Sequence, residues 1–273
     1  MKTKIVFEED KKEWGSTRMR GFDIAAEVKC DIDSIESSYL DKNKRLIVTK
    51  MSDYSNLLNL SNSNEIVIDM VDFKKDKQLF LFENFDFGIF TSIAQMEKYM
   101  NFFKYPEKCL VIYHHWDPRL AGLKTKEELE ICYFGDKRKC LHFGEIDGVD
   151  FHHIDGNTFE SNISKYLDYN CHYILKPEKH EDLIQPMTKL SNSASLNCPV
   201  ISKNSRQYVE LLGDYYPYFV ESDDIDSINL CIDKIRSTFK CSDWNLAKEI
   251  MLDVKSRTSL EKICEIYKSK IIV

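Results

Sequence analysis

Residues 185–213, QPMTKLSNSASLNCPVISKNSRQYVELLG, contain the pattern that decides the fold. Pro186 suits the first position of a helix, because its ring fixes φ and its missing N–H would have no helical partner there. We expect this helix to end near Asn197 and the apolar residues 198–201 to form a short strand, with Pro199 where no ladder donor is required. A second helix over 205–212 follows and ends at Gly213. A helix, a strand and a helix in succession are typical of an α/β domain.

Strands and helices alternate on both sides of this stretch. In the first half we expect a helix that begins after the turn-rich link 13–21, a helix capped at Ser92, and strands at 4–7, 45–51, 65–71, 85–90 and 109–113. In the second half we expect strands at 129–134, 149–153, 171–175, 199–202 and 218–220, and three closing helices at 226–239, 244–254 and from 258. This alternation predicts parallel sheets with helices on both faces.

The segment HHWDPRLAG at 114–122 interrupts the alternation. A chain of 273 residues is long enough for two compact domains, each with its own core. We therefore expect an N-terminal domain over 1–118 and a C-terminal domain over 119–273, both α/β and doubly wound.

Composition indicates a globular protein and limits its partners. Hydrophobic residues make up 43% of the chain and the net charge is −7, which disfavours broad nucleic-acid binding. We find no apolar run long enough for a signal peptide or a membrane span, so we expect a cytoplasmic protein without a transmembrane segment. The nine cysteines show no CxxC pair, and we expect them to be reduced.

Polar residues collect in the opening turns of the helix at 186–197. Thr188, Lys189 and Asn192 place a hydroxyl, an ammonium and an amide beside the unpaired N–H groups of a helix N-terminus, which forms a plausible anion site. Simple capping and a solvated lysine are the alternative.

Other cationic groups follow predicted strands. Arg18 and Arg20 lie between two glycines after the first strand, and Lys137 and Arg138 follow the turn at Gly135; each is either a phosphate contact or an ordinary surface charge. All seven histidines lie between 114 and 180, including two doublets. Because adjacent strand residues point to opposite faces and no zinc spacing occurs, we expect no metal site.

Several segments together resemble the GT-B nucleotide-sugar glycosyltransferases. TKLSNSASLNCPVIS at 188–202 is similar to the bacterial segment in which a Thr-Lys-Leu-x-Asn-Ala helix precedes a Pro-Val-Ile strand and a later Tyr-x-Glu, here Tyr208 to Glu210. WGSTRMRG at 14–21 resembles the family's first loop, YHHWDPRL at 113–120 its linker, and ICYFGDKRK at 131–139 the first strand of its donor domain. The resemblance covers nearly the whole chain.

The resemblance implies a GT-B fold: two Rossmann-like domains facing each other across a cleft, with a helical C-terminus. The C-terminal domain would bind a UDP- or GDP-linked sugar, and the N-terminal domain would face a hydroxyl acceptor in a glycan or glycoconjugate. We expect a hexosyltransferase that requires no metal or other cofactor, because cationic side chains replace it. A lipid-linked acceptor would bring peripheral contact with a membrane.

The resemblance also implies roles for individual residues. We expect Thr188 and Lys189 to contact the diphosphate and Asn192 and Glu210 to contact the sugar or ribose. The remaining donor contacts are expected from Arg20, Lys137, Arg138 and, in the base pocket, Tyr173, whose alternative role is core packing. The expected catalytic residues are Arg18 and, as a general base, His114 or Asp117.

One departure from the family keeps other functions open. Many retaining members have two glutamates separated by seven residues, and here Ile184 and Asn192 occupy those positions. The stereochemical outcome is therefore open. An inactive sugar-binding or scaffold protein and a nucleotide-sugar epimerase or phosphorylase on the same fold remain alternatives.

Overall fold

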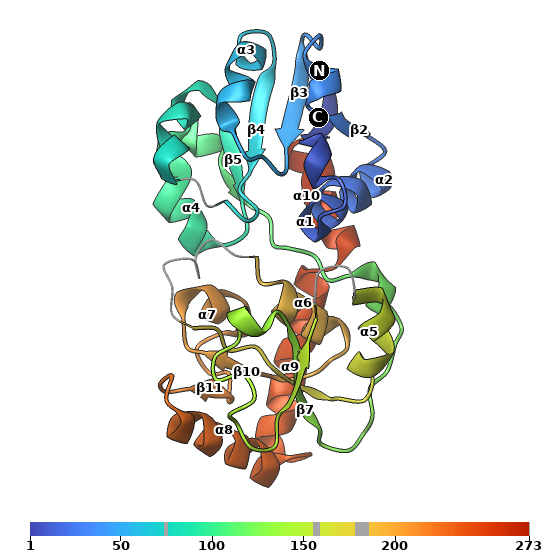
Figure 1. Cartoon of the computed structure of the whole chain (residues 1–273), viewed down its shortest axis with the longest axis vertical. Coiled ribbons are helices and arrows are strands. Elements are labelled where there is room, and N and C mark those ends of the chain that lie inside the picture. The colour runs from blue at the N-terminus through green and yellow to red at the C-terminus, as the bar shows by residue number, and fades with distance from the viewer. Residues whose placement is uncertain (74–75, 155–158, 178–185, 273) are drawn as a thin grey trace. The chain divides into compact units, whose positions relative to one another are not determined.

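The computed structural model describes residues 1–73, 76–154, 159–177 and 186–272. The described chain forms two compact units (Figure 1). The first unit consists mainly of Met1–His115 and Ser259–Val273, and the second of Trp116–Lys179 and Met187–Thr258. Each unit contains one parallel sheet with helices packed against it, as the alternation of strands and helices predicts.

The first unit has a six-stranded sheet in the order β2-β1-β3-β4-β5-β6 with every pair parallel. Its strands are β1 (Lys2–Phe7), β2 (Asp31–Ser34), β3 (Lys44–Val48), β4 (Glu65–Asp69), β5 (Phe87–Phe90) and β6 (Leu110–Val111). The expected strands are confirmed, although β6 is shorter than predicted. Strand β2 was not predicted, because its sequence DIDS is an exposed, acidic edge strand without a β-branched run.

Alternation along these strands creates two apolar faces. Ile5, Ile47 and Val67 belong to one core cluster, and Val6 and Leu46 belong to the cluster on the other side of the sheet. Successive strand residues point to opposite faces, so strands buried on both sides form nearly continuous hydrophobic runs.

The helices of the first unit are α1 (Gly15–Thr17), α2 (Ile24–Val28), α3 (Leu58–Ser61), α4 (Ile93–Tyr99) and α10 (Leu260–Lys270). A π-helical turn, Arg18–Asp23, joins α1 to α2. Ser92 caps α4 by accepting a hydrogen bond from the N–H of Gln95 at 3.1 Å, as predicted.

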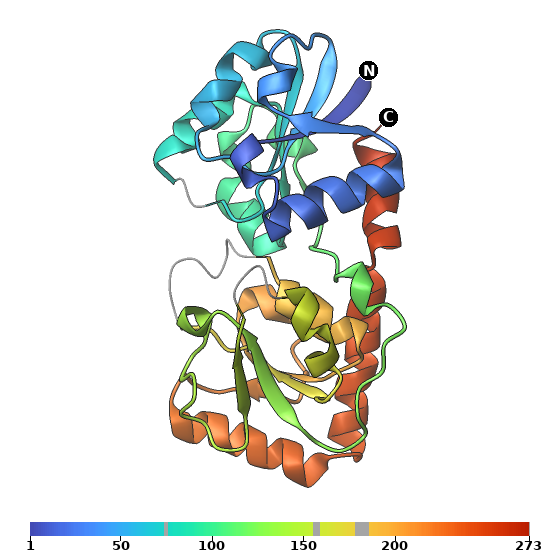
Figure 2. The same cartoon turned by 45° about the vertical axis from the view of Figure 1, so that its right-hand side comes forward.

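Helix α10 packs beside α2 although they lie at opposite ends of the chain (Figure 2). Its Ile263, Cys264 and Tyr267 are buried in the same cluster as Ile5 and Ile24. The predicted division at Pro118 assigned everything after it to the second domain, whereas these apolar contacts place Ser259–Val273 in the first unit.

The second unit has a five-stranded parallel sheet in the order β11-β10-β9-β7-β8. Its strands are β7 (Ile131–Gly135), β8 (Asp150–His153), β9 (Cys171–Tyr173), β10 (Val200–Lys203) and β11 (Phe219–Val220). Its helices are α5 (Phe159–Tyr166), α6 (Thr188–Ser195), α7 (Arg206–Leu212), α8 (Ile225–Thr238) and α9 (Ser242–Arg257). All five expected strands are present.

Helix α6 differs from its prediction at both ends. It begins at Thr188, with Met187 at the N-cap, so Pro186 precedes the helix instead of occupying its first position. It ends at Ser195, and Asn197 follows in the left-handed region with φ of 54°. Asparagine tolerates this conformation better than most residues, which explains the stop.

The remaining global expectations concern cysteines and membrane spans. All nine cysteines lack disulfides, and most are buried. None of the helices in the described ranges combines the length and the apolar character needed to traverse a bilayer.

Candidate functional site

The most unusual group of the second unit lies where β7 ends and α6 begins. The Lys189 Nζ sits 3.5 Å from the centre of the Tyr133 ring, within range of a cation–π contact. Gly135, with φ of +145°, makes this approach possible, because a Cβ there would lie 2.8 Å from the same nitrogen. Tyr133 and Gly135 both belong to β7, so the strand end and the helix start together hold the ammonium.

The Lys189 ammonium is buried, and no carboxylate of the described residues forms an ion pair with it. The Lys189 Nζ has no hydrogen-bond partner among the described residues. Burial and the nearby Lys176 lower the pKa of Lys189 well below 10.5; Lys139 acts in the same direction, while Cys140 and Asp136 oppose it. An unpaired buried cation is costly unless an anion joins it. The arrangement is therefore suited to a ligand that carries negative charge.

A basic turn follows the same strand. Asp136 caps the 3₁₀ turn Lys137–Lys139 by accepting from the N–H of Arg138 at 3.0 Å. The Arg138 guanidinium also bonds the Asp136 carboxylate, at 2.7 Å from Nη2, which holds the pKa of Asp136 well below its usual range. Arg138 is highly exposed and Lys137 is exposed, so both lie on the surface beside the buried lysine and not within its enclosure.

The other predicted residues of α6 have different positions. Thr188 is the first helical residue and is half-buried. Asn192 is buried, and its Oδ1 accepts a hydrogen bond from the backbone N–H of Asp117 at 2.9 Å. This bond fastens the segment before β7 to the helix, so the structure gives Asn192 a positioning role that the sequence did not suggest.

Asp117 itself is tied to its neighbour. One carboxylate oxygen accepts from the Arg119 backbone N–H at 3.1 Å, and the other lies 2.7 Å from the Arg119 Nη2. The carboxylate thus caps the 3₁₀ turn Pro118–Leu120.

Tyr173 and Glu210 also have local contacts. Tyr173 is buried, donates from its hydroxyl to the carbonyl of Leu141 at 2.8 Å, and packs among Tyr133 and Phe151. This corresponds to the core-packing alternative. Glu210 is half-buried on α7, and its backbone carbonyl accepts a hydrogen bond from the Nη2 of Arg257, the last residue of α9, at 3.2 Å.

The first unit holds the remaining predicted residues. Arg20 is fully buried: its Nε donates to Asp69 at 2.7 Å, and its Nη1 donates to the carbonyls of Ile112 and Tyr113. Burial lowers the Arg20 pKa, but the carboxylate of Asp69 outweighs it, so the net pKa lies above the ordinary value. Arg20 therefore joins the ends of β4 and β6 within the core.

Arg18 and His114 differ in exposure. Arg18 is about one-third exposed and lies 3.5 Å from the Asp23 carboxylate. His114 is buried, and its Nδ1 must donate to the His115 carbonyl, at 3.0 Å, because a carbonyl only accepts. Burial, His115 and Arg20 lower the pKa of His114 to about 3, with Asp72 opposing. At neutral pH its ring is uncharged, and Nε2 is the unprotonated nitrogen.

Sequence reasoning missed the partners of Lys189. Tyr133 and Gly135 were assigned to a strand and a turn only, since nothing local indicates which helix meets that strand end. No group of three or more His, Cys, Asp or Glu side chains within the described parts of the chain is placed to hold a metal ion.

Comparison with known proteins defines the fold class. The sequence matches no protein-family model and no curated protein. The structure, however, has the GT-B fold of glycosyltransferases of known structure, as the sequence resemblance predicted.

Three of these structures illustrate the likeness. A glycosyltransferase from Rickettsia africae is 10% identical with a TM-score of 0.68, over 99% of this chain and 98% of that one. HepE from Anabaena, solved in complex with UDP, is 10% identical with a TM-score of 0.67 over 99% of both chains. The β-glucosyltransferase of phage T4 is 12% identical with a TM-score of 0.54 over 100% of both.

Proposed function

We propose that this protein is a glycosyltransferase that moves a hexose from a nucleotide sugar to a hydroxyl acceptor, with UDP as the first nucleotide to test. The buried Lys189 ammonium, which has no hydrogen-bond partner among the described residues, carries the proposal. A nucleoside diphosphate would supply the missing negative charge, and the GT-B fold and the UDP complex of HepE support the same ligand class.

The chemistry requires charge stabilisation at the leaving group. The acceptor oxygen bonds to the anomeric carbon, the bond from that carbon to the diphosphate oxygen breaks, and the leaving diphosphate takes the electron pair. Lys189 and the N–H groups that open α6 would neutralise the growing charge. In this proposal fixed protein charges take the role that a divalent cation has elsewhere, so the transfer is metal-independent.

The roles that we propose for the other predicted residues follow from their positions. Thr188 would contact the diphosphate, with Lys137 and Arg138 reaching it from the surface. Glu210 would contact the ribose. Asn192, Arg20 and Tyr173 are proposed as positioning residues, because their side chains already bond Asp117, Asp69 and Leu141.

For the acceptor proton we favour His114 over Asp117. The His114 Nε2 carries no proton in the neutral ring and can accept one, although the lowered pKa of His114 makes the ring a weak base. The Asp117 carboxylate is engaged by Arg119. Arg18 is proposed to stabilise charge on the reacting groups, since it is partly exposed. A cytoplasmic location and peripheral membrane contact through a lipid-linked acceptor also remain predictions.

The test combines binding and turnover. Binding is measured by titration calorimetry with UDP, and turnover by hydrolysis of a panel of UDP-, GDP- and CMP-sugars. We expect Lys189→Met to lose most of its UDP affinity and Lys189→Arg to keep part of it. Losing a charge-assisted contact to phosphate costs about 1.5–3 kcal/mol, or roughly tenfold to a hundredfold in affinity. Lys165→Met, at an exposed lysine of α5, is the matched control. Unchanged affinity and turnover in Lys189→Met would rule the proposal out.

A nucleotide-sugar-binding protein without turnover is the second candidate. The observation that favours it is the arrangement around Asp117 and Asn192, where the carboxylate is held by Arg119 and an amide stands in place of a family glutamate. The same assay separates these candidates from a transferase. Binding without nucleotide release indicates the inactive protein, and an epimerised donor indicates the epimerase. With an acceptor present, His114→Gln should lower turnover and leave UDP affinity unchanged.

A further inference from the structure

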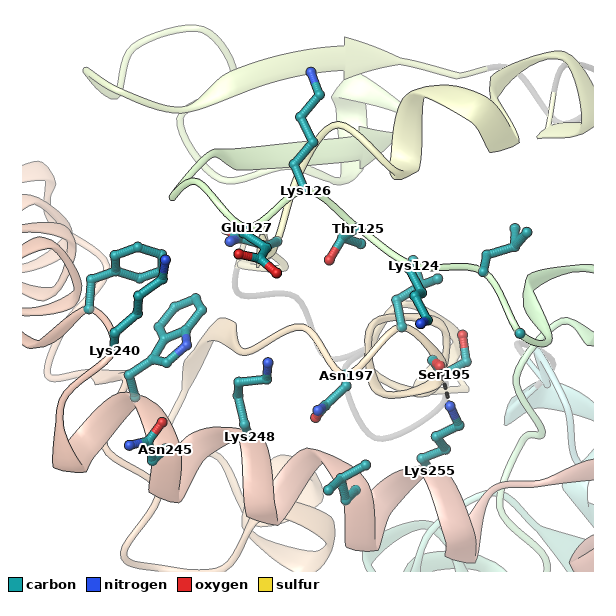
Figure 3. A pocket seen from close by; sticks show the side chains of 17 residues that line it. Lys124, Thr125, Lys126, Glu127, Ser195, Asn197, Lys240, Asn245, Lys248 and Lys255 are labelled. Carbon is teal, nitrogen blue, oxygen red and sulfur yellow. Dashed lines mark hydrogen bonds between the residues drawn. The ribbon is translucent and has the colours of Figure 1, made fainter.

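A second hollow lies at the other end of α6, away from Lys189. It has a volume of about 680 Å³ and lies between the C-terminal end of α6 and α9 (Figure 3). Its lining consists of residues 122–127 before β7, Asn170, residues 195–197, residues 239–240 and side chains of α9. Lys189 lies in the first turn of α6, whereas this hollow begins at its last residue, Ser195. A helix of this length separates the two places by roughly 10 Å. The hollow is therefore distinct from the proposed nucleotide site.

The lining is strongly basic. It contains one glutamate, Glu127, and five lysines: Lys124, Lys126, Lys240, Lys248 and Lys255. Two of the lysines have partners, because Lys126 lies 2.8 Å from Asp168 and Lys255 donates to the Ser195 carbonyl at 2.7 Å.

The other three lysines, Lys124, Lys240 and Lys248, have no acidic partner within 4.0 Å in the described chain. The Lys240 Nζ lies over the Phe239 ring, at 5.2 Å from its centre. Lys248 is half-buried. Uncompensated ammonium groups around one concave space favour an anionic occupant.

An unpaired hydrogen-bond acceptor in the lining adds a second requirement for the ligand. The Asn197 Oδ1 is buried and has no hydrogen-bond partner among the described residues. Figure 3 shows the Asn197 and Lys248 side chains extending toward the same space from opposite elements. An unpaired buried acceptor calls for a donor such as a hydroxyl group.

The size of the hollow indicates a small molecule. Ligand pockets commonly measure about 300–1,000 Å³. The Phe239 and Trp244 rings, with centres 4.8 Å apart, form an apolar wall on one side. Such a wall suits a carbon skeleton between the charged and hydroxyl groups of a ligand.

We propose that this hollow binds a phosphate ester that also carries hydroxyl groups, through Lys124, Lys240, Lys248 and Asn197. A free sugar phosphate and a phospholipid headgroup share this chemistry. Lysine binds phosphate as a point charge, and the hydroxyl satisfies the Asn197 oxygen.

The test uses the full chain with UDP at saturation, so that the nucleotide site is occupied. Fructose bisphosphate is titrated by calorimetry, and vesicles of phosphatidylcholine with or without phosphatidylglycerol are tested by co-sedimentation. Binding of fructose bisphosphate supports a soluble ligand, and binding only to the phosphatidylglycerol vesicles supports a lipid headgroup. Absence of both kinds of binding overturns the proposal.

Variants locate the binding. Lys248→Glu and Lys240→Glu should each weaken it by roughly tenfold, since they replace attraction by repulsion. Lys248→Arg should keep most of it, and Asn197→Asp should weaken it by adding negative charge. Lys165→Glu, on α5 outside the hollow, is the control. Equal loss in Lys165→Glu, or unchanged binding in Lys248→Glu, would contradict the site, and circular dichroism shows that each variant is folded.

Discussion

At the residue scale, Lys189 combines a stability cost with the proposed ligand contact. Its ammonium is enclosed by Tyr133 and Gly135 and has no partner in the described chain. Groups retained at such cost are typical of functional sites, where stability is exchanged for binding. This cost is measurable in the protein without ligand.

We predict that Lys189→Met stabilises the ligand-free protein by about 1–3 kcal/mol at neutral pH, because methionine fills similar space without a buried charge. The folded pKa of Lys189 lies below 10.5, so the folded state binds fewer protons than the unfolded state between the two pKa values. Stability due to this group therefore falls as pH falls below 10.5. The advantage of Lys189→Met should shrink as the pH approaches that value, as urea unfolding at pH 7 and pH 10 would show.

The matched variant is Lys165→Met, which changes an exposed lysine and should alter stability by less than about 0.5 kcal/mol. Destabilisation by Lys189→Met at pH 7, or an advantage independent of pH, would contradict the interpretation of this lysine as a buried unpaired cation.

Individual side-chain partners were the least predictable feature of the sequence. Residue type and position suggested an anion site at Thr188 and Lys189, and the structure adds the burial of Lys189. No local pattern indicates that Asn192 bonds Asp117, 75 positions away, or that Arg20 pairs with Asp69. Such pairs depend on which strand ends become neighbours, and sequence spacing does not contain that information.

At the element scale, the turn from β7 into Lys137–Lys139 depends on one glycine. Gly135 has φ of +145°, a region that other residues rarely adopt, and a Cβ there would contact the Lys189 Nζ. A Cβ at this position would displace the ammonium from the place it occupies between the end of β7 and the start of α6.

We predict that Gly135→Ala destabilises the protein by about 1–3 kcal/mol and weakens UDP binding, because the backbone is strained and the ammonium is displaced. Gly144→Ala is the matched control: its φ is +79° but an added Cβ has nothing within 4 Å. It should cost about 1 kcal/mol for the backbone alone and leave UDP affinity intact. Thermal unfolding and UDP calorimetry on both variants test this; equal loss of affinity in the two would contradict it.

Elements themselves were predicted well where their patterns are strong. Strands such as β3 and β4 are apolar runs, and the cap at Ser92 follows the capping-box pattern. The last helix was expected from 258, and the structure has its N-cap at Ser259. Strand β2 was missed because edge strands need no apolar pattern, and the start of α6 was misplaced by two residues because proline also occurs just before helices.

At the scale of the whole molecule, the C-terminal helix belongs to the N-terminal unit. Sequence order placed the boundary at Pro118 and could not show that α10 returns to the first unit. The amphipathic pattern of α10 predicts a buried face without identifying its partner. Tyr267 lies on this buried face: its side chain is fully buried, and its hydroxyl donates a hydrogen bond to Asp69 at 3.3 Å.

We predict that Tyr267→Ala destabilises the first unit by about 3–5 kcal/mol through the cavity it leaves. Tyr267→Phe should cost only about 1 kcal/mol, since it removes a single hydrogen bond to a carboxylate that Arg20 also satisfies. Glu265→Ala, on the exposed side of α10, is the control. UDP should raise the temperature of the unfolding transition of the unit that binds it. If α10 were part of the second unit energetically, Tyr267→Ala would lower the temperature of that same transition in calorimetry. We expect it to lower a transition that UDP leaves unchanged, because the proposed nucleotide contacts around Lys189 lie in the second unit.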